Sequence, residues 1–79
     1  MELTCKQAIR TVLDSPSDAL VFAIYMHVRK KWRYICNQHD PNKRTLHSDI
    51  AVPLAQRLVL WGMNKISETQ DAQLQQMAG

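Results

Sequence analysis

The chain has 79 residues, of which 46% are hydrophobic, and a formal net charge of +3. That hydrophobic fraction is ordinary for a globular protein and argues against intrinsic disorder. The length fits a single domain, 1–79, that buries only about 60% of its unfolded surface. The longest apolar run, 19–26, is far shorter than the roughly 20 residues of a membrane span.

Capping signals and hydrophobic periodicity predict the first two helices. One opens at Thr4, which with Gln7 has the spacing of a capping box, and continues for about 10 residues with one apolar face. The next opens at Ser15, with Pro16 at its first position, and runs to about Cys36. This second helix is apolar all round at first and amphipathic later, which is typical of a long central helix.

A third helix is expected to begin between His47 and Asp49, with Pro53 in or just past its first turn. Residues 67–79 form either a separate fourth helix capped at Ser67 or the polar end of one long helix. No segment alternates convincingly with period two, so no strand is predicted. The expected fold is all-α: a compact bundle of three or four helices with a long central helix and a basic inter-helix turn.

The two cysteines, Cys5 and Cys36, are too few for a disulfide scaffold. If the first helix folds back on the second, Cys5 lies level with the middle of the second helix. Cys36 then lies about 15 Å further along, beyond the roughly 7 Å between Cα atoms that a disulfide allows. We expect two free thiols in a reducing compartment. The start of the chain lacks the basic residues of a secretory signal, so a cytoplasmic location is predicted.

Basic charge is concentrated in residues 29–44, RKKWRYICNQHDPNKR, which carry a local balance of +5 while the rest carries −2. Such a positive end attracts phosphates or acidic proteins. The cations would neutralise phosphates, and either aromatic residue would stack on a base. The candidate binding residues are Arg29, Lys30, Lys31, Trp32, Arg33, Tyr34, Lys43 and Arg44.

The leading hypothesis is a small non-enzymatic regulatory protein that binds nucleic acid through this basic end. An alternative is a protein-interaction module or inhibitor that docks on another protein through the basic end or an apolar helix face. A third interpretation gives the cations a structural role only, because they complement the helix dipole and cover apolar surface. The sequence does not separate DNA, RNA and an acidic protein surface as partners.

No catalytic, metal or cofactor site is predicted. Cys36, His39 and His47 are the nearest approach to a zinc site, but their spacing matches no standard finger. Cys36 and His39 also resemble a nucleophile and base, yet no third orienting group is visible. There is no Gly-rich phosphate loop. We therefore expect a protein that is not an enzyme.

The run around Leu58, Trp61 and Met63 is apolar on more than one face. It packs either in the core of this domain or in the seam of a homodimer. We expect the homodimer, because three short helices do not easily cover so broad a surface. Within this run Trp61 has apolar neighbours, whereas Trp32 is flanked by two cations, so Trp61 is expected to be the more buried tryptophan.

Overall fold

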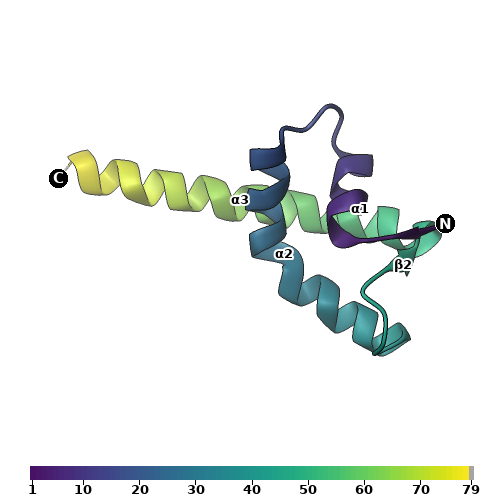
Figure 1. Ribbon diagram of the computed structural model, residues 1–79. Coiled ribbons are helices and arrows are strands. Elements are labelled where there is room, and N and C mark those ends of the chain that lie inside the picture. Colours follow the sequence, from purple (N-terminus) through teal and green to yellow (C-terminus); the bar gives the residue numbers. More distant parts are fainter. Residues whose placement is uncertain (79) are drawn as a thin grey trace.

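The computed structural model describes residues 1–78 and shows three helices packed on one another. Gly79, which the single predicted domain includes, lies outside the described residues. The elements in chain order are β1 (Glu2–Leu3), α1 (Cys5–Val12), α2 (Asp18–His39), β2 (Leu46–His47) and α3 (Ser48–Ala78) (Figure 1). The all-α prediction is confirmed. Within 1–78, no helix combines the length and hydropathy that a bilayer crossing requires.

Side-chain caps fix where α1 and α2 begin. The predicted capping box is present: the Thr4 amide donates to Gln7 Oε1 at 2.9 Å, and the Gln7 amide donates to Thr4 Oγ1 at 3.2 Å. The second helix begins later than predicted, because Ser17 is its cap and accepts a hydrogen bond from the Leu20 amide at 3.1 Å. Ser15 instead lies in the connecting turn with φ of 50°.

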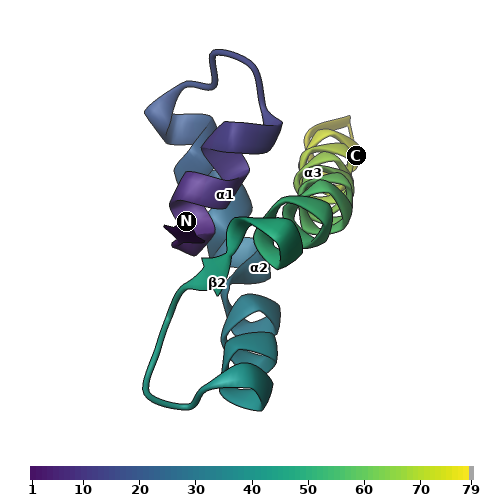
Figure 2. The same cartoon turned by 90° about the vertical axis from the view of Figure 1, so that its right-hand side faces the viewer.

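Helix α3 is one continuous helix of 31 residues. It begins at Ser48, within the predicted interval, and includes Pro53. Ser67 does not cap a fourth helix, so the single-helix alternative holds. Every side chain in 67–76 is exposed. This half of α3 extends beyond the other helices in Figure 1, and Figure 2 looks along α3 from its N-terminal end.

The prediction that the chain contains no strand is wrong. Strands β1 and β2 pair antiparallel, with Glu2 opposite His47 and Leu3 opposite Leu46. A further bond from the Ser48 amide to the Met1 carbonyl, 2.7 Å long, continues the pairing. Each strand has only two residues, too few to produce an alternating pattern. The pairing ties the start of α1 to the start of α3.

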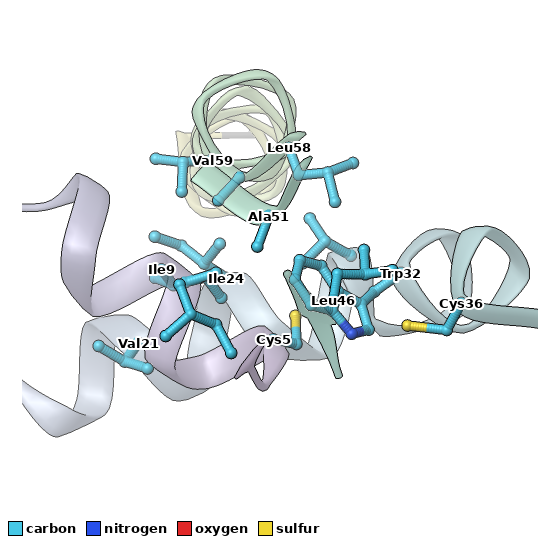
Figure 3. Close-up of a cluster of buried hydrophobic side chains, with 14 residues drawn as sticks. Cys5, Ile9, Val21, Ile24, Trp32, Cys36, Leu46, Ala51, Leu58 and Val59 are labelled. Atoms are coloured by element: carbon cyan, nitrogen blue, oxygen red, sulfur yellow. The ribbon is translucent and has the colours of Figure 1, made fainter. Parts of the chain in front are cut away.

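The core lies where α1, α2 and α3 meet (Figure 3). Helix α2 supplies buried residues spaced by three or four positions: Val21, Ile24, Val28, Trp32 and Cys36. The burial of the two tryptophans is the reverse of the prediction. Trp32 is 3% exposed, whereas Trp61 is only partly buried against the edge of the core. The charged neighbours of Trp32 point to other faces of the helix, and its own position continues the apolar stripe.

Candidate nucleic-acid interface

The second half of α2 carries most of the basic residues, and helical spacing divides them among different faces. Arg29 and Arg33 are four positions apart and lie on one face, with Lys30 and Tyr34 on the neighbouring face. All four side chains are exposed, and Tyr34 is 66% exposed. One side of α2 therefore presents three cations and an aromatic ring to solvent.

Trp32 cannot stack on a base as the sequence analysis proposed, because its ring is buried in the core. Its indole Nε1 instead donates a hydrogen bond to the Arg44 backbone carbonyl at 3.0 Å. Arg44 Nη1 in turn donates to Asn37 Oδ1 at 3.3 Å. These two bonds hold the loop before β2 against α2 and place Arg44 beside the basic side of the helix.

The same loop is shaped by a turn at 40–42. The Asn42 amide donates to Asp40 Oδ1 at 3.0 Å, and the Lys43 amide donates to the Asp40 carbonyl at 3.1 Å. An aspartate that bonds the backbone two residues on is a common turn former. The carboxylate of Asp40 therefore accepts a hydrogen bond from within the loop. Asp40 and Arg44 line two different hollows of the surface.

A pocket of about 330 Å³ opens where the start of α1, the middle of α2 and this loop meet. Four of the residues that line it are cationic and none is acidic. The lining consists of Thr4, Cys5, Lys6, Tyr25, Arg29, Trp32, Arg33 and Arg44. Three separate segments of the chain thus bring their positive side chains to one concave site.

Lys6 belongs to this pocket although the sequence analysis counted it outside the basic stretch. Its Nζ lies 5.0 Å from the ring centre of Tyr25 and 5.8 Å from that of Phe22, within the range of cation–π attraction. The antiparallel packing of the first two helices had already placed Cys5 level with the middle of the second helix. The same reasoning, applied to the next residue, would have found Lys6.

Three cations of the basic stretch lie apart from the pocket. Lys30 is one of them, and it lines a separate groove together with Lys31 and Tyr34. Lys43 pairs with Glu2, with Nζ and Oε1 3.8 Å apart. Lys31 lies over the Trp61 ring, 4.8 Å from its centre, and lines a groove shared by α2 and Leu58 of α3. The six predicted cations therefore do not form one continuous surface.

The cations that remain are free of acidic partners within residues 1–78. The ion pairs described there involve Arg10, Lys43, His47 and Lys65 as the basic members. None uses Arg29, Lys30, Arg33 or Arg44. A cluster of like charges without internal counterions creates a positive potential that attracts an external anion.

Of the metal candidates, His39 and His47 line one hollow beside β2, and Cys36 does not line it. Cys36 is buried, whereas His39 and His47 are exposed. Among the described residues, no three His, Cys, Asp or Glu side chains are close enough to hold a metal ion.

Both cysteines are free, as predicted. Burial raises the pKa of the Cys5 thiol to about 12, with the nearby Cys36 adding to the rise. Burial also raises the pKa of Cys36, although the neighbouring Arg44 opposes this. The two thiols are therefore neutral at physiological pH, and neutral thiols are poor nucleophiles and poor metal ligands.

The residues proposed for core or dimer seam have different environments. Leu58 is buried in the core at 7% exposure, and Met63 is 44% exposed. Trp61 is covered in part by Lys31 and Lys65, whose Nζ atoms lie 4.8 and 5.5 Å from its ring centre. Leu58 thus packs within this chain, and only Met63 of the three is substantially open to a partner.

Comparisons of the chain with protein-family models, with curated proteins and with solved structures found no match.

Proposed function

We propose that the protein is a small non-enzymatic regulator that binds nucleic acid through a cationic face centred on α2. The face consists of Lys6, Arg29, Lys30, Arg33 and Arg44, with Tyr34 at its border. The observation that carries the proposal is the convergence of four cations from three chain segments on one pocket that no acidic residue lines.

Nucleic acid fits this face in charge and in chemistry. Phosphates are the main contacts of most nucleic-acid-binding proteins, and arginine is well suited to them because its fork of N–H donors matches two phosphate oxygens. Three of the five cations are arginines. The exposed ring of Tyr34 offers a stacking surface for an unpaired base, which an acidic protein partner would not use.

The proposal is tested by titrating labelled single-stranded DNA, duplex DNA and RNA at several salt concentrations. With about three to five phosphate contacts, the logarithm of the binding constant should fall with the logarithm of salt with a slope of about −3 to −4.5 on duplex DNA. A double change of Arg29 and Arg33 to alanine should flatten that slope by about two.

Arg57→Ala is the matched control, because Arg57 is an exposed arginine of α3 that lines none of the pockets described here. It should leave the slope nearly unchanged. If the folded protein binds no nucleic acid even at low salt, the proposal is wrong and docking on an acidic protein becomes the better explanation.

The proposal includes the predicted homodimer and cytoplasmic location. Leu60 and Leu74 are 68% and 62% exposed on α3 and lie with Met63 on its outward side. These exposed apolar side chains support the dimer, because a second copy would cover them. The two free cysteines are typical of a reducing compartment such as the cytoplasm.

A further inference from the structure

We propose that the pocket between α1, α2 and the loop before β2 binds a phosphomonoester, the doubly charged phosphate found at the end of a nucleic-acid strand or on a free nucleotide. Binding of a terminal phosphate on a nucleic-acid strand rests on the proposed function, whereas binding of a free nucleotide does not. It assigns to the pocket a task different from that of the open side of α2.

The shape of the site separates its ligand from an ordinary backbone phosphate. A duplex presents its internal phosphates along a continuous ridge, which can lie on the open side of α2 beside Lys30. A pocket of about 330 Å³, at the small end of the usual range for ligand sites, instead admits a group that projects from the end of a chain. A terminal phosphate has this freedom, whereas an internal phosphate is tied on both sides.

The charge of the pocket also favours a monoester. A phosphodiester carries one negative charge, whereas a phosphomonoester carries about −1.5 to −2 at neutral pH and has three strong acceptor oxygens. Lys6, Arg29, Arg33 and Arg44 all line the pocket, and each is a donor without acceptor capacity. One phosphodiester would neutralise only one of the four positive charges. A phosphomonoester neutralises more of them and is therefore bound more strongly by this site.

Two features of the free protein hold the cations close before any ligand arrives. Arg29 and Arg33 are one helical turn apart, a spacing at which like charges repel. Arg44 is held beside them by the bond of its carbonyl to Trp32 Nε1 and by the bond of its guanidinium to Asn37 Oδ1. A bound dianion relieves this repulsion, and sites that are arranged in advance lose less entropy on binding.

The test compares two otherwise identical single strands of about 12 nucleotides, a length within the usual site sizes, one with a 5′-phosphate and one with a 5′-hydroxyl. Adenosine 5′-monophosphate, with adenosine as its control, is the free-nucleotide arm. We expect the phosphorylated strand to bind about tenfold more tightly, the size of effect of one charge-assisted contact. Adenosine 5′-monophosphate should compete for the site and adenosine should not.

Variants assign the preference to the pocket. Lys6→Ala and Arg44→Ala each remove a pocket cation and should bring the affinities of the two strands to within about twofold of each other. Lys30→Ala, the matched control on the open side of α2, should weaken both strands equally and leave their ratio near tenfold. Circular dichroism and thermal melts establish that each variant is folded.

The outcomes separate this inference from the proposed function. Equal binding of the two strands with a steep salt dependence overturns the phosphomonoester site and leaves nucleic-acid binding intact. If neither strand binds but adenosine 5′-monophosphate does, and Lys6→Ala abolishes that binding, the phosphomonoester pocket is supported and the proposed function is overturned. A preference that survives both pocket variants places the terminal phosphate elsewhere and overturns the inference.

Discussion

Trp32 connects the hydrophobic core with the cationic face. Its ring fills the space between α2 and Leu46 of β2 (Figure 3), and its indole N–H reaches out of the core to the Arg44 carbonyl. A buried tryptophan usually finds a partner for its N–H, and here the partner is the loop that carries a binding residue. Packing and site geometry therefore depend on the same side chain.

Trp32→Ala should destabilise the protein more than Trp61→Ala. Truncating a fully buried tryptophan costs about 3–5 kcal/mol, and Trp32 is 3% exposed. Trp61 is only partly buried, so its truncation should cost about 1–2 kcal/mol in lost apolar contact and cation–π attraction. Denaturant melts of the two variants measure both losses. Equal losses, or a larger one at Trp61, would contradict the packing described here.

Trp32→Phe is the companion variant that separates the two tasks of the residue. Phenylalanine retains most of the ring but has no N–H to donate, so the cost in stability should be smaller than for alanine. The loop should nevertheless lose its bond at the Arg44 carbonyl, and the affinity for the phosphorylated strand should fall. A variant that binds as tightly as the wild type would show that this bond does not position Arg44.

For single residues, the sequence predicts which side chains can bind an anion or cap a helix better than it predicts where those side chains lie in the fold. The concentration of cations at 29–44 is visible in the order of residues, and so is the capping box at Thr4. Which cations converge on the pocket depends on tertiary packing. That packing brings Lys6 into the pocket and leaves Lys30, Lys31 and Lys43 outside it. The burial of Trp32 was misjudged because its neighbours in sequence were weighed more heavily than its position on the helix.

Among the elements, α3 packs tightly against α2 at Gly62. A Cβ atom built there would lie 3.2 Å from Ile24 Cγ2 and 3.3 Å from Val28 Cγ1. Both neighbours are 0% exposed, and β-branched side chains have little freedom to rotate away. Gly62 lowers helix propensity relative to alanine, but its lack of a side chain allows the two helices to pack together.

Gly62→Ala should destabilise the protein by about 1 kcal/mol. Alanine gains about 1 kcal/mol in helix propensity, but crowding a packed core costs about 1–3 kcal/mol. In a Val28→Ala background the crowding is relieved, and the same substitution should become neutral or stabilising. Denaturant melts of the two single variants and the double variant complete the cycle. A stabilised Gly62→Ala in the wild-type background would show that the contact has room.

How far the fold follows from sequence differs between elements. The helices follow from periodicity and caps, because both are local properties of a continuous segment, and the shortest of the three helices has eight residues. Strands β1 and β2 do not, because two residues give no pattern and their pairing joins positions 2–3 with 46–47. The start of α2 was placed two residues early, since both Ser15 and Ser17 are acceptable caps and only the turn geometry at Ser15 decides between them.

The whole molecule is elongated, with extents of 48 × 26 × 17 Å, and much of its length is the projecting half of α3 (Figure 1). Isolated helices of about a dozen residues are only marginally stable in water, and residues 67–76 contact nothing that buries their side chains. Leu60, Met63 and Leu74 fall on the three-and-four-residue spacing of a coiled-coil seam, and the two positions of that spacing between Met63 and Leu74 are the polar Ser67 and Gln70. A second copy would stabilise this half of the helix through an isologous contact.

The last prediction is that changing Leu60 and Met63 together to lysine converts a dimer into a folded monomer. Both side chains are exposed on α3, so the change should cost the monomer little stability, whereas two charges in an apolar seam should prevent pairing. Sedimentation equilibrium over a range of concentrations should give twice the 9.1 kDa chain mass for the wild type and the chain mass for the variant. Phe22→Lys, at an exposed position of α2, is the control and should remain dimeric. A wild type that is monomeric at every concentration would show that α3 does not pair with itself, and each particle would then carry one cationic face instead of two.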